Sequence, residues 1–112
     1  MIDLAKWMYL LHSGKLLADS TYQAMITNAV IRPHRWGELK YAYGIQVDNQ
    51  DDIAELSMGG YVPGFISTMI YYPKAKVSIV ILENISPSPS DMNRVFYFHD
   101  QIRKVVRTSF QF

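Results

Sequence analysis

The sequence predicts an α+β protein in which helices flank an antiparallel sheet. Apolar residues recur at helical spacing near both ends of the chain. The region between them alternates apolar and polar residues, or runs apolar between turn residues, as strands do. Helices, then strands, then a helix is the order typical of α+β proteins. The 112 residues, 49% of them hydrophobic, fit a single domain over residues 1–112.

Two helices are predicted before the strands. The first spans residues 3–13, with Asp3 as a candidate N-cap and Gly14 as its stop. Its apolar residues share one face: Leu4, Trp7, Met8, Leu11. Ser20 is predicted to be the N-cap of a second, short helix that ends near Asn28.

A loop and a four-strand meander are predicted next. Residues 29–39 are predicted to be a loop, because Pro33 and Gly37 interrupt any regular pattern. The predicted strands are 41–47, 53–58, 65–72 and 77–82. The last strand is apolar at nearly every position, so both its faces are expected to be covered. Asp48–Asp52 is interpreted as a solvated turn, since it lacks the glycine and the distal glutamate of a calcium loop.

A long C-terminal helix is predicted to pack on the meander. Residues 85–89 are a connector, and Ser90 or Asp91 is the expected N-cap. The predicted inner stripe is Met92, Val95, Phe96, His99, Ile102, Val106, Phe110. The basic residues are expected to lie largely outside, where cations near a helix end complement its dipole: Arg94, Arg103, Lys104, Arg107.

Composition excludes several classes of function. The chain has no cysteine, so disulfides, thiolate catalysis and thiolate metal sites are excluded. A net charge of +1 gives no reason to expect a nucleic-acid or anionic-membrane partner. No apolar run is long enough to span a bilayer, and the first residues do not have the pattern of a signal peptide.

The most informative segment runs from Met58 through Gly59, Gly60 and Tyr61 to Phe65. Two glycines after a strand let a ligand approach the backbone closely. The alternative for a glycine pair is a tight turn or bulge. Met58 itself is interpreted as a packing residue at the end of a strand.

This segment resembles the C-terminal region of the serine β-lactamase and penicillin-binding-protein-like hydrolases, particularly their class C-like, esterase-related branch. Tyr71-Tyr72-Pro73 and an apolar strand ending in Glu83-Asn84 follow it, as in the family. Asp3–Trp7 resembles a helix of the family, and Tyr41–Gly44 resembles its Tyr-Gly-Tyr-Gly-Trp strand. The resemblance runs from about residue 3 to about residue 108. It implies a partial β-lactamase/transpeptidase-like fold, and acyl transfer to or hydrolysis of a β-lactam, peptide or ester.

The resemblance also assigns roles to the segment. The backbone N–H of Tyr61 would help to form an oxyanion hole. Met58 occupies the place of a lysine or histidine, so it can neither attract a substrate carboxylate nor transfer a proton. Met58, Gly59 and Gly60 are therefore a vestigial third motif.

The family's other two motifs are absent from this sequence. No serine has a lysine three residues on, and there is no Tyr-x-Asn or Ser-x-Asn. Both motifs lie upstream of this region in the family. The chain is therefore expected to be a C-terminal fragment that is inactive alone.

No metal or cofactor is predicted. His12, His34 and His99 show no metal-ligand spacing. His99 is interpreted as a core or boundary histidine. His34 is interpreted as an ordinary residue of a loop that contains proline and tryptophan, and a site role for it is the weaker interpretation. The aromatic residues Trp7 and Tyr71-Tyr72 are interpreted as core.

Two functional hypotheses remain. The chain is the C-terminal segment of a serine hydrolase, or a non-catalytic binding or assembly module on a degenerate hydrolase scaffold, as Met58 suggests. The family places strands from its N-terminal part beside these C-terminal strands. The expected partner is therefore that missing part, or a second copy joined by edge pairing or exchange of a terminal helix.

Overall fold

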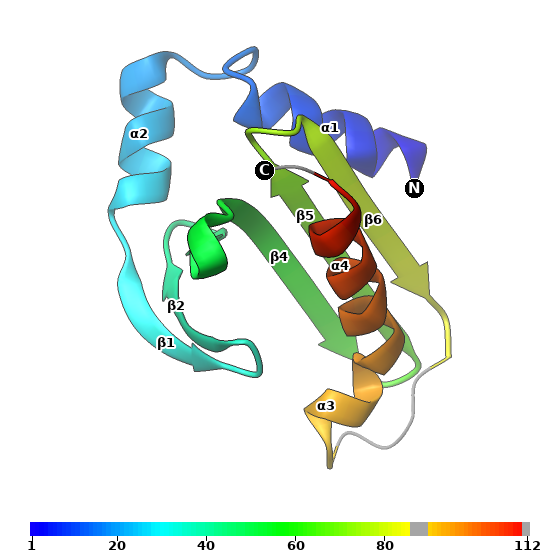
Figure 1. Cartoon of the computed structure of the whole chain (residues 1–112). Coiled ribbons are helices and arrows are strands. Elements are labelled where there is room, and N and C mark those ends of the chain that lie inside the picture. Colours follow the sequence, from blue (N-terminus) through cyan, green and yellow to red (C-terminus); the bar gives the residue numbers. More distant parts are fainter. Residues whose placement is uncertain (86–89, 111–112) are drawn as a thin grey trace.

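A computed structural model describes residues 1–85 and 90–110. It confirms the α+β class and the antiparallel sheet, in which the strands follow chain order from β1 to β6 (Figure 1). The sheet has six strands rather than the four predicted: β1 (Val30–His34), β2 (Gly37–Tyr41), β3 (Gln46–Asp48), β4 (Glu55–Val62), β5 (Phe65–Tyr72) and β6 (Val77–Glu83). The helical elements are α1 (Ile2–His12), α2 (Asp19–Thr27), η1 (Gln50–Asp52), α3 (Met92–Val95) and α4 (Tyr97–Ser109).

Helices cover both faces of the larger strands, with α1 on one face and α4 on the other (Figure 1). Successive residues of β5 point to opposite faces, as strand geometry requires. Tyr71 packs beside Met8 of α1, whereas Thr68 contacts His99 of α4. The core on the α1 side contains Met8, Ala42, Ile45, Leu56 and Tyr71. The core on the α4 side contains Ile66, Ile70, Tyr72, Ile79, Val95 and Phe96.

Both N-terminal helices begin earlier than the caps predicted from the sequence. Ser20 lies inside α2, whose N-cap is Ala18 without a side-chain hydrogen bond. The Ala18 carbonyl accepts from the Tyr22 N–H, so the first turn begins two residues before Ser20. Asp3 likewise lies in the first turn of α1, where its charge complements the helix dipole. Gly14 has a φ of +79°, as expected of a glycine just beyond a helix.

The loop predicted over residues 29–39 is wrong, because this segment forms the β1–β2 hairpin. The turn at Arg35 and Trp36 closes the pair His34↔Gly37, and Gly37 takes a φ of +112°. Pro33 is tolerated because β1 is an edge strand. Pro33 and Gly37 therefore belong to a hairpin and do not interrupt the regular structure.

The predicted strands 41–47 and 53–58 were also wrong in extent. Ala42 donates to the Ile45 carbonyl at 2.8 Å, so a turn interrupts the first of them. β4 continues through Gly59 and Gly60 in regular register with β5, and neither glycine is a turn or a bulge. By contrast, strand 65–72 matches β5, and strand 77–82 matches β6 to within one residue.

The C-terminal helix is divided in two at Phe96, and Asp91 caps the first part by accepting from the Asn93 and Arg94 N–H groups. The predicted connector lies mostly outside the described residues, at 86–89. Three residues of the predicted inner stripe are exposed rather than buried: Met92, Ile102 and Phe110. Coverage of both faces of the last strand is also incomplete, since Leu82 is exposed.

The largest error concerns charge. Arg103 and Arg107 were expected outside, but their side chains are only 12% and 10% exposed and pair with Glu55 of β4. The aspartate-rich turn is likewise only partly solvated. It contains η1, and the Asp48 side chain is 8% exposed.

Candidate functional site

The candidate site lies where one side of β4 becomes unpaired. β3 pairs with β4 only at Glu55, Leu56 and Ser57. Beyond Ser57, no described strand pairs with β4 on the side away from β5. The two-residue turn between β4 and β5 closes the pair Val62↔Phe65. Because hydrogen bonding alternates along an antiparallel strand, Gly59 and Tyr61 direct their backbone groups away from β5.

A hollow of about 290 Å³ lies beside this open edge. Gly59, Gly60 and Tyr61 line one side of it. The other lining residues come from the β1–β2 hairpin, β3 and the α3 region: His34, Arg35, Gln46, Met92 and Phe96. The structure therefore brings together three of the four predicted site residues and adds the hairpin tip to them.

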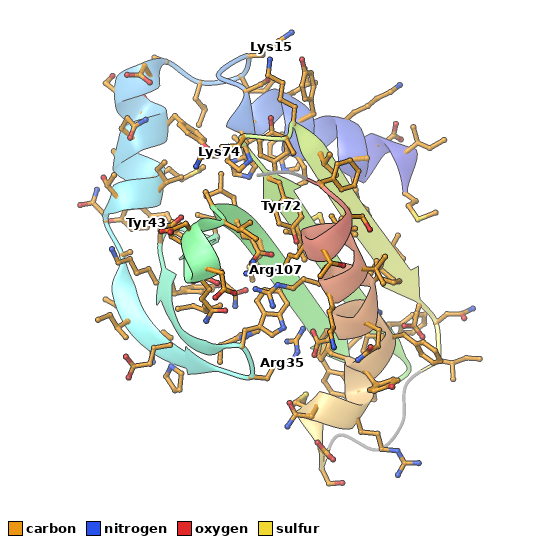
Figure 2. The ribbon with its side chains drawn as sticks, in the orientation of Figure 1. Lys15, Arg35, Tyr43, Tyr72, Lys74 and Arg107 are labelled. Atoms are coloured by element: carbon orange, nitrogen blue, oxygen red, sulfur yellow. The ribbon has the colours of Figure 1, made fainter. Side chains whose placement is uncertain are left out.

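An ionic contact with α4 fixes the hairpin tip. Arg35 donates from Nε and Nη2 to Asp100, with distances of 2.8 Å to Oδ2 and Oδ1 respectively. The Trp36 indole N–H donates to the same carboxylate at 2.8 Å. The Arg35 guanidinium also lies 4.2 Å from the centre of the Phe96 ring. Figure 2 labels Arg35 between the hairpin and α4. A bidentate salt bridge between Arg35 and Asp100 thus holds one wall of the hollow in place.

His34 lies in the lining between two hydrogen-bond donors. The Trp36 backbone N–H donates to Nδ1 at 3.1 Å, and Arg35 Nη1 lies 3.2 Å from Nε2. Burial, and then the charge of Arg35, lower the pKa of His34 to about 4. The imidazole is therefore neutral at pH 7 and presents no positive charge to the hollow.

A buried carboxylate anchors the other end of α4 to β4. Glu55 is fully buried and accepts hydrogen bonds from Arg103, from Arg107 and from the Tyr72 hydroxyl. Burial and the hydrogen bond to Glu55 raise the pKa of Tyr72, which stays protonated as the donor. The Arg103 guanidinium also lies 3.9 Å from the Trp36 ring centre, so it links this cluster to the hairpin.

His99 ties α4 to the next two strands. Its Nδ1 is 2.7 Å from Thr68 Oγ1, and its Nε2 is 2.6 Å from Glu83 Oε1. Hydroxyl, imidazole and carboxylate follow the order of a catalytic triad. Thr68 is only 2% exposed, however, so a substrate has no access to its hydroxyl. The arrangement holds α4 in place, which confirms His99 as a core histidine.

Met58 is separated from the hollow. In the pleat of β4 its side chain points to the α1 side, where the Tyr41 hydroxyl donates to its sulfur at 3.8 Å. His12, the last residue of α1, is also distant, since its ring packs between those of Tyr22 and Tyr71. Sequence reasoning missed Arg35, Gln46 and Phe96. No local signal marks these residues, because they reach the hollow only through contacts distant in sequence.

The residues that the structure describes contain no group of three or more histidines and carboxylates placed to hold a metal ion. Among the same residues, no helix is long and apolar enough to cross a bilayer.

Comparisons with known proteins agree with this architecture. A family model described as Beta-lactamase matches residues 1–104. The fold and the sequence thus define a serine β-lactamase or penicillin-binding-protein-like class. The chain belongs to the beta-lactamase family, which confirms the resemblance seen in its sequence.

Among solved structures, the chain is similar to the crystal structure of a penicillin binding protein from Bacillus halodurans. The TM-score is 0.69, with 22% identity over 92% of this chain and 29% of that chain. At this identity the likeness shows the fold alone. The chain spans less than a third of the length of this relative. A comparison with curated proteins gives no significant match.

Proposed function

We propose that this chain supplies the strand edge of an acyl-transfer site in a β-lactamase-related serine hydrolase that acts on a β-lactam, peptide or ester. The observation that carries the proposal is the open edge of β4, where the Tyr61 N–H faces a hollow. Backbone donors fixed by a sheet stabilise a tetrahedral oxyanion at no cost in reorganisation. Gly59 and Gly60 carry no side chain that would obstruct an approaching acyl group.

The nucleophile in this proposal belongs to the rest of the fold. No serine of this chain has a lysine three residues on. The chain also spans only 29% of the similar penicillin-binding protein. In this proposal the missing motifs lie in the part of the fold that the chain does not span. We therefore expect no covalent labelling of the isolated chain by a fluorescent penicillin and no hydrolysis of a chromogenic β-lactam or ester.

A chimera tests the proposal. This chain replaces the matching part of the Bacillus halodurans protein, and the rate of labelling by a fluorescent penicillin is measured. Tyr61→Pro removes the outward N–H at an edge position that tolerates proline. Loss of one oxyanion donor should slow acylation by about 10²–10³-fold.

The matched control is Tyr61→Phe, which keeps the backbone N–H and should label at the rate of the unsubstituted chimera. Circular dichroism establishes that both variants are folded. Equal labelling rates for the folded Tyr61→Pro and Tyr61→Phe chimeras would show that this edge takes no part in acyl transfer.

A second candidate function is a non-catalytic binding or assembly module. The uncharged Met58 sulfur, turned away from the hollow toward Tyr41, favours it. Met58→Lys in the same chimera separates the two. A rise in labelling would show that a basic group at this position of β4 promotes acylation and would favour the enzyme. Absence of labelling in every folded variant favours the module.

A further inference from the structure

The hollow beside the open edge of β4 has walls that this chain builds and fastens itself. Residues of β3, of the β1–β2 hairpin and of the α3 region line it together with β4. The salt bridge between Arg35 and Asp100 holds the hairpin wall. On the β3 wall, the buried Ser57 hydroxyl donates to Gln46 Oε1 at 3.1 Å. The arrangement of the hollow is therefore fixed by contacts within the chain.

The size of the hollow suits one group of a substrate. Sites that bury a whole small molecule measure about 300–1,000 Å³. The hollow, at about 290 Å³, lies just below this range. A single ring or a short alkyl group therefore fits, and the rest of the substrate has to lie outside.

Among the described residues that line the hollow, Arg35 alone is charged at pH 7, and its charge is used within the chain. The neutral His34 adds none. Each guanidinium nitrogen of Arg35 has a partner: Nε and Nη2 donate to Asp100, and Nη1 lies 3.2 Å from His34 Nε2. The guanidinium also lies 4.2 Å from the Phe96 ring centre. An anion that entered the hollow would find no free cation and would be repelled by Asp100.

The remaining lining residues are uncharged: Gln46, Gly59, Gly60, Tyr61, Met92 and Phe96. Phe96 is only 6% exposed, so its ring is held in the fold. A carboxylate that enters such a site loses its water and gains no partner, which is costly. An apolar group gains from leaving water in the same place. The lining thus discriminates between neutral and anionic groups of the same shape.

We propose that the hollow is a specificity subsite, which takes an uncharged, largely apolar group attached to the reacting carbonyl and rejects a carboxylate there. The inference rests on the proposed function. Tyr61, whose N–H would hold the carbonyl oxygen, also lines the hollow, so a group next to that carbonyl lies within its reach. The substrate class is then an acyl compound that is neutral around its reacting carbonyl.

Ester hydrolysis by the same chimera tests this subsite. Phenyl phenylacetate is neutral on both sides of its carbonyl, and two analogues carry a carboxylate on one ring or on the other. The kcat/KM of each ester is divided by its uncatalysed rate in buffer. At least one of the carboxylate esters should then react about tenfold more slowly than the neutral ester, because its charge is desolvated without a partner.

A cation introduced into the hollow should reverse this preference. Gln46→Lys should raise the relative rate of the disfavoured ester about tenfold, because the new ammonium group pairs with the carboxylate. The matched control is Gln23→Lys, the same change at an exposed position of α2 that does not line the hollow. It should leave the ratio of the rates unchanged.

A second variant keeps the test decisive if Gln46→Lys unfolds the chimera by leaving Ser57 without its acceptor. Met92→Lys adds the same charge at a lining residue that is 43% exposed, and Met92→Leu is its uncharged control. Met92→Lys should raise the relative rate of the disfavoured ester, whereas Met92→Leu should not.

The outcomes separate this subsite from the proposed function. A chimera that reacts with fluorescent penicillin but hydrolyses the three esters at equal relative rates, or hydrolyses none, would overturn the subsite alone. A preference for the neutral ester that neither lysine variant changes would do the same. Folded chimeras that neither react with penicillin nor hydrolyse any ester would overturn both the subsite and the proposed function.

Discussion

The two flanks of α4 meet their partners in different ways. On the flank toward β4, Asp100, Arg103 and Arg107 are partly or largely buried and bind carboxylate or basic groups of this same chain. On the flank toward β6, Phe98, Ile102 and Val105 remain exposed. The charged flank is thus complete within the chain, and the apolar flank is not.

The difference follows from the free energy that is lost when a charged or an apolar side chain has no partner. An unpaired buried charge is strongly destabilising, so the partners of Arg103 and Arg107 must come with the fold. Exposed apolar side chains cost little free energy, so these residues need no partner within this chain. Accordingly, the charged flank builds a wall of the candidate site, and the apolar flank stays exposed in this chain.

The largest expected effect comes from breaking the charged flank at its centre. Glu55→Ala leaves two buried guanidinium groups without their shared carboxylate and should cost about 3–5 kcal/mol of unfolding free energy. Urea denaturation followed by circular dichroism measures it. Asp51→Ala is the control. Its side chain also binds Arg107 but is 85% exposed, so the loss should stay below about 1 kcal/mol.

Asp100→Asn should have the next largest effect. The asparagine keeps the size of the side chain but loses the charge that holds Arg35 and the Trp36 indole. Hydrogen bonds to charged groups are worth about 1.5–3 kcal/mol. The measured quantities are the unfolding free energy and the Trp36 fluorescence. An unchanged free energy would show that the hairpin tip is held by packing alone.

Acid should weaken the charged side of α4 through His34. Its pKa is lowered to about 4 in the fold, so the unfolded chain binds the proton more tightly. The stability that His34 contributes is complete above pH 6.5 and is lost as the pH falls toward 4. Because His34 is partly exposed, we expect a loss of roughly 1 kcal/mol.

The measurement is the unfolding free energy between pH 8 and pH 4, where His34→Gln should flatten the curve. His12 contributes in the same direction, since burial lowers its pKa to about 4. It lies on the α1 side of the sheet, so His12→Phe should flatten the curve further and independently. A His34→Gln curve parallel to that of the unsubstituted chain would contradict the assignment.

The smallest effect is expected on the apolar flank. Phe98→Ala changes a largely exposed side chain and should alter the unfolding free energy of the monomer by less than about 0.5 kcal/mol. Urea denaturation followed by circular dichroism measures it. A larger loss would mean that Phe98 already packs within its own chain.

The sequence predicted the features that depend on local pattern. Strand 65–72 and the glycine at the end of α1 were correct, because alternation and a positive φ are read from neighbouring residues. Gly59, Gly60 and Tyr61 were grouped by resemblance to the family, but the glycines were expected to follow a strand, whereas β4 continues through all three residues.

The errors arise where contacts distant in sequence decide the structure. Arg103 and Arg107 occupy positions that suit a solvated helix face, and only the buried Glu55, about fifty residues earlier, turns them inward. Pro33 and Gly37 were interpreted as loop residues, although an edge strand and its turn accept both. Arg35 reached the candidate site through Asp100, a contact that no local pattern encodes.

The labelling rate of the Tyr61→Pro chimera relative to that of Tyr61→Phe tests the central claim most directly. If the open edge of β4 supplies an oxyanion donor, the proline variant reacts with fluorescent penicillin about 10²–10³-fold more slowly. If both folded variants react at the same rate, the edge is not part of an acyl-transfer site, and the proposed function is wrong.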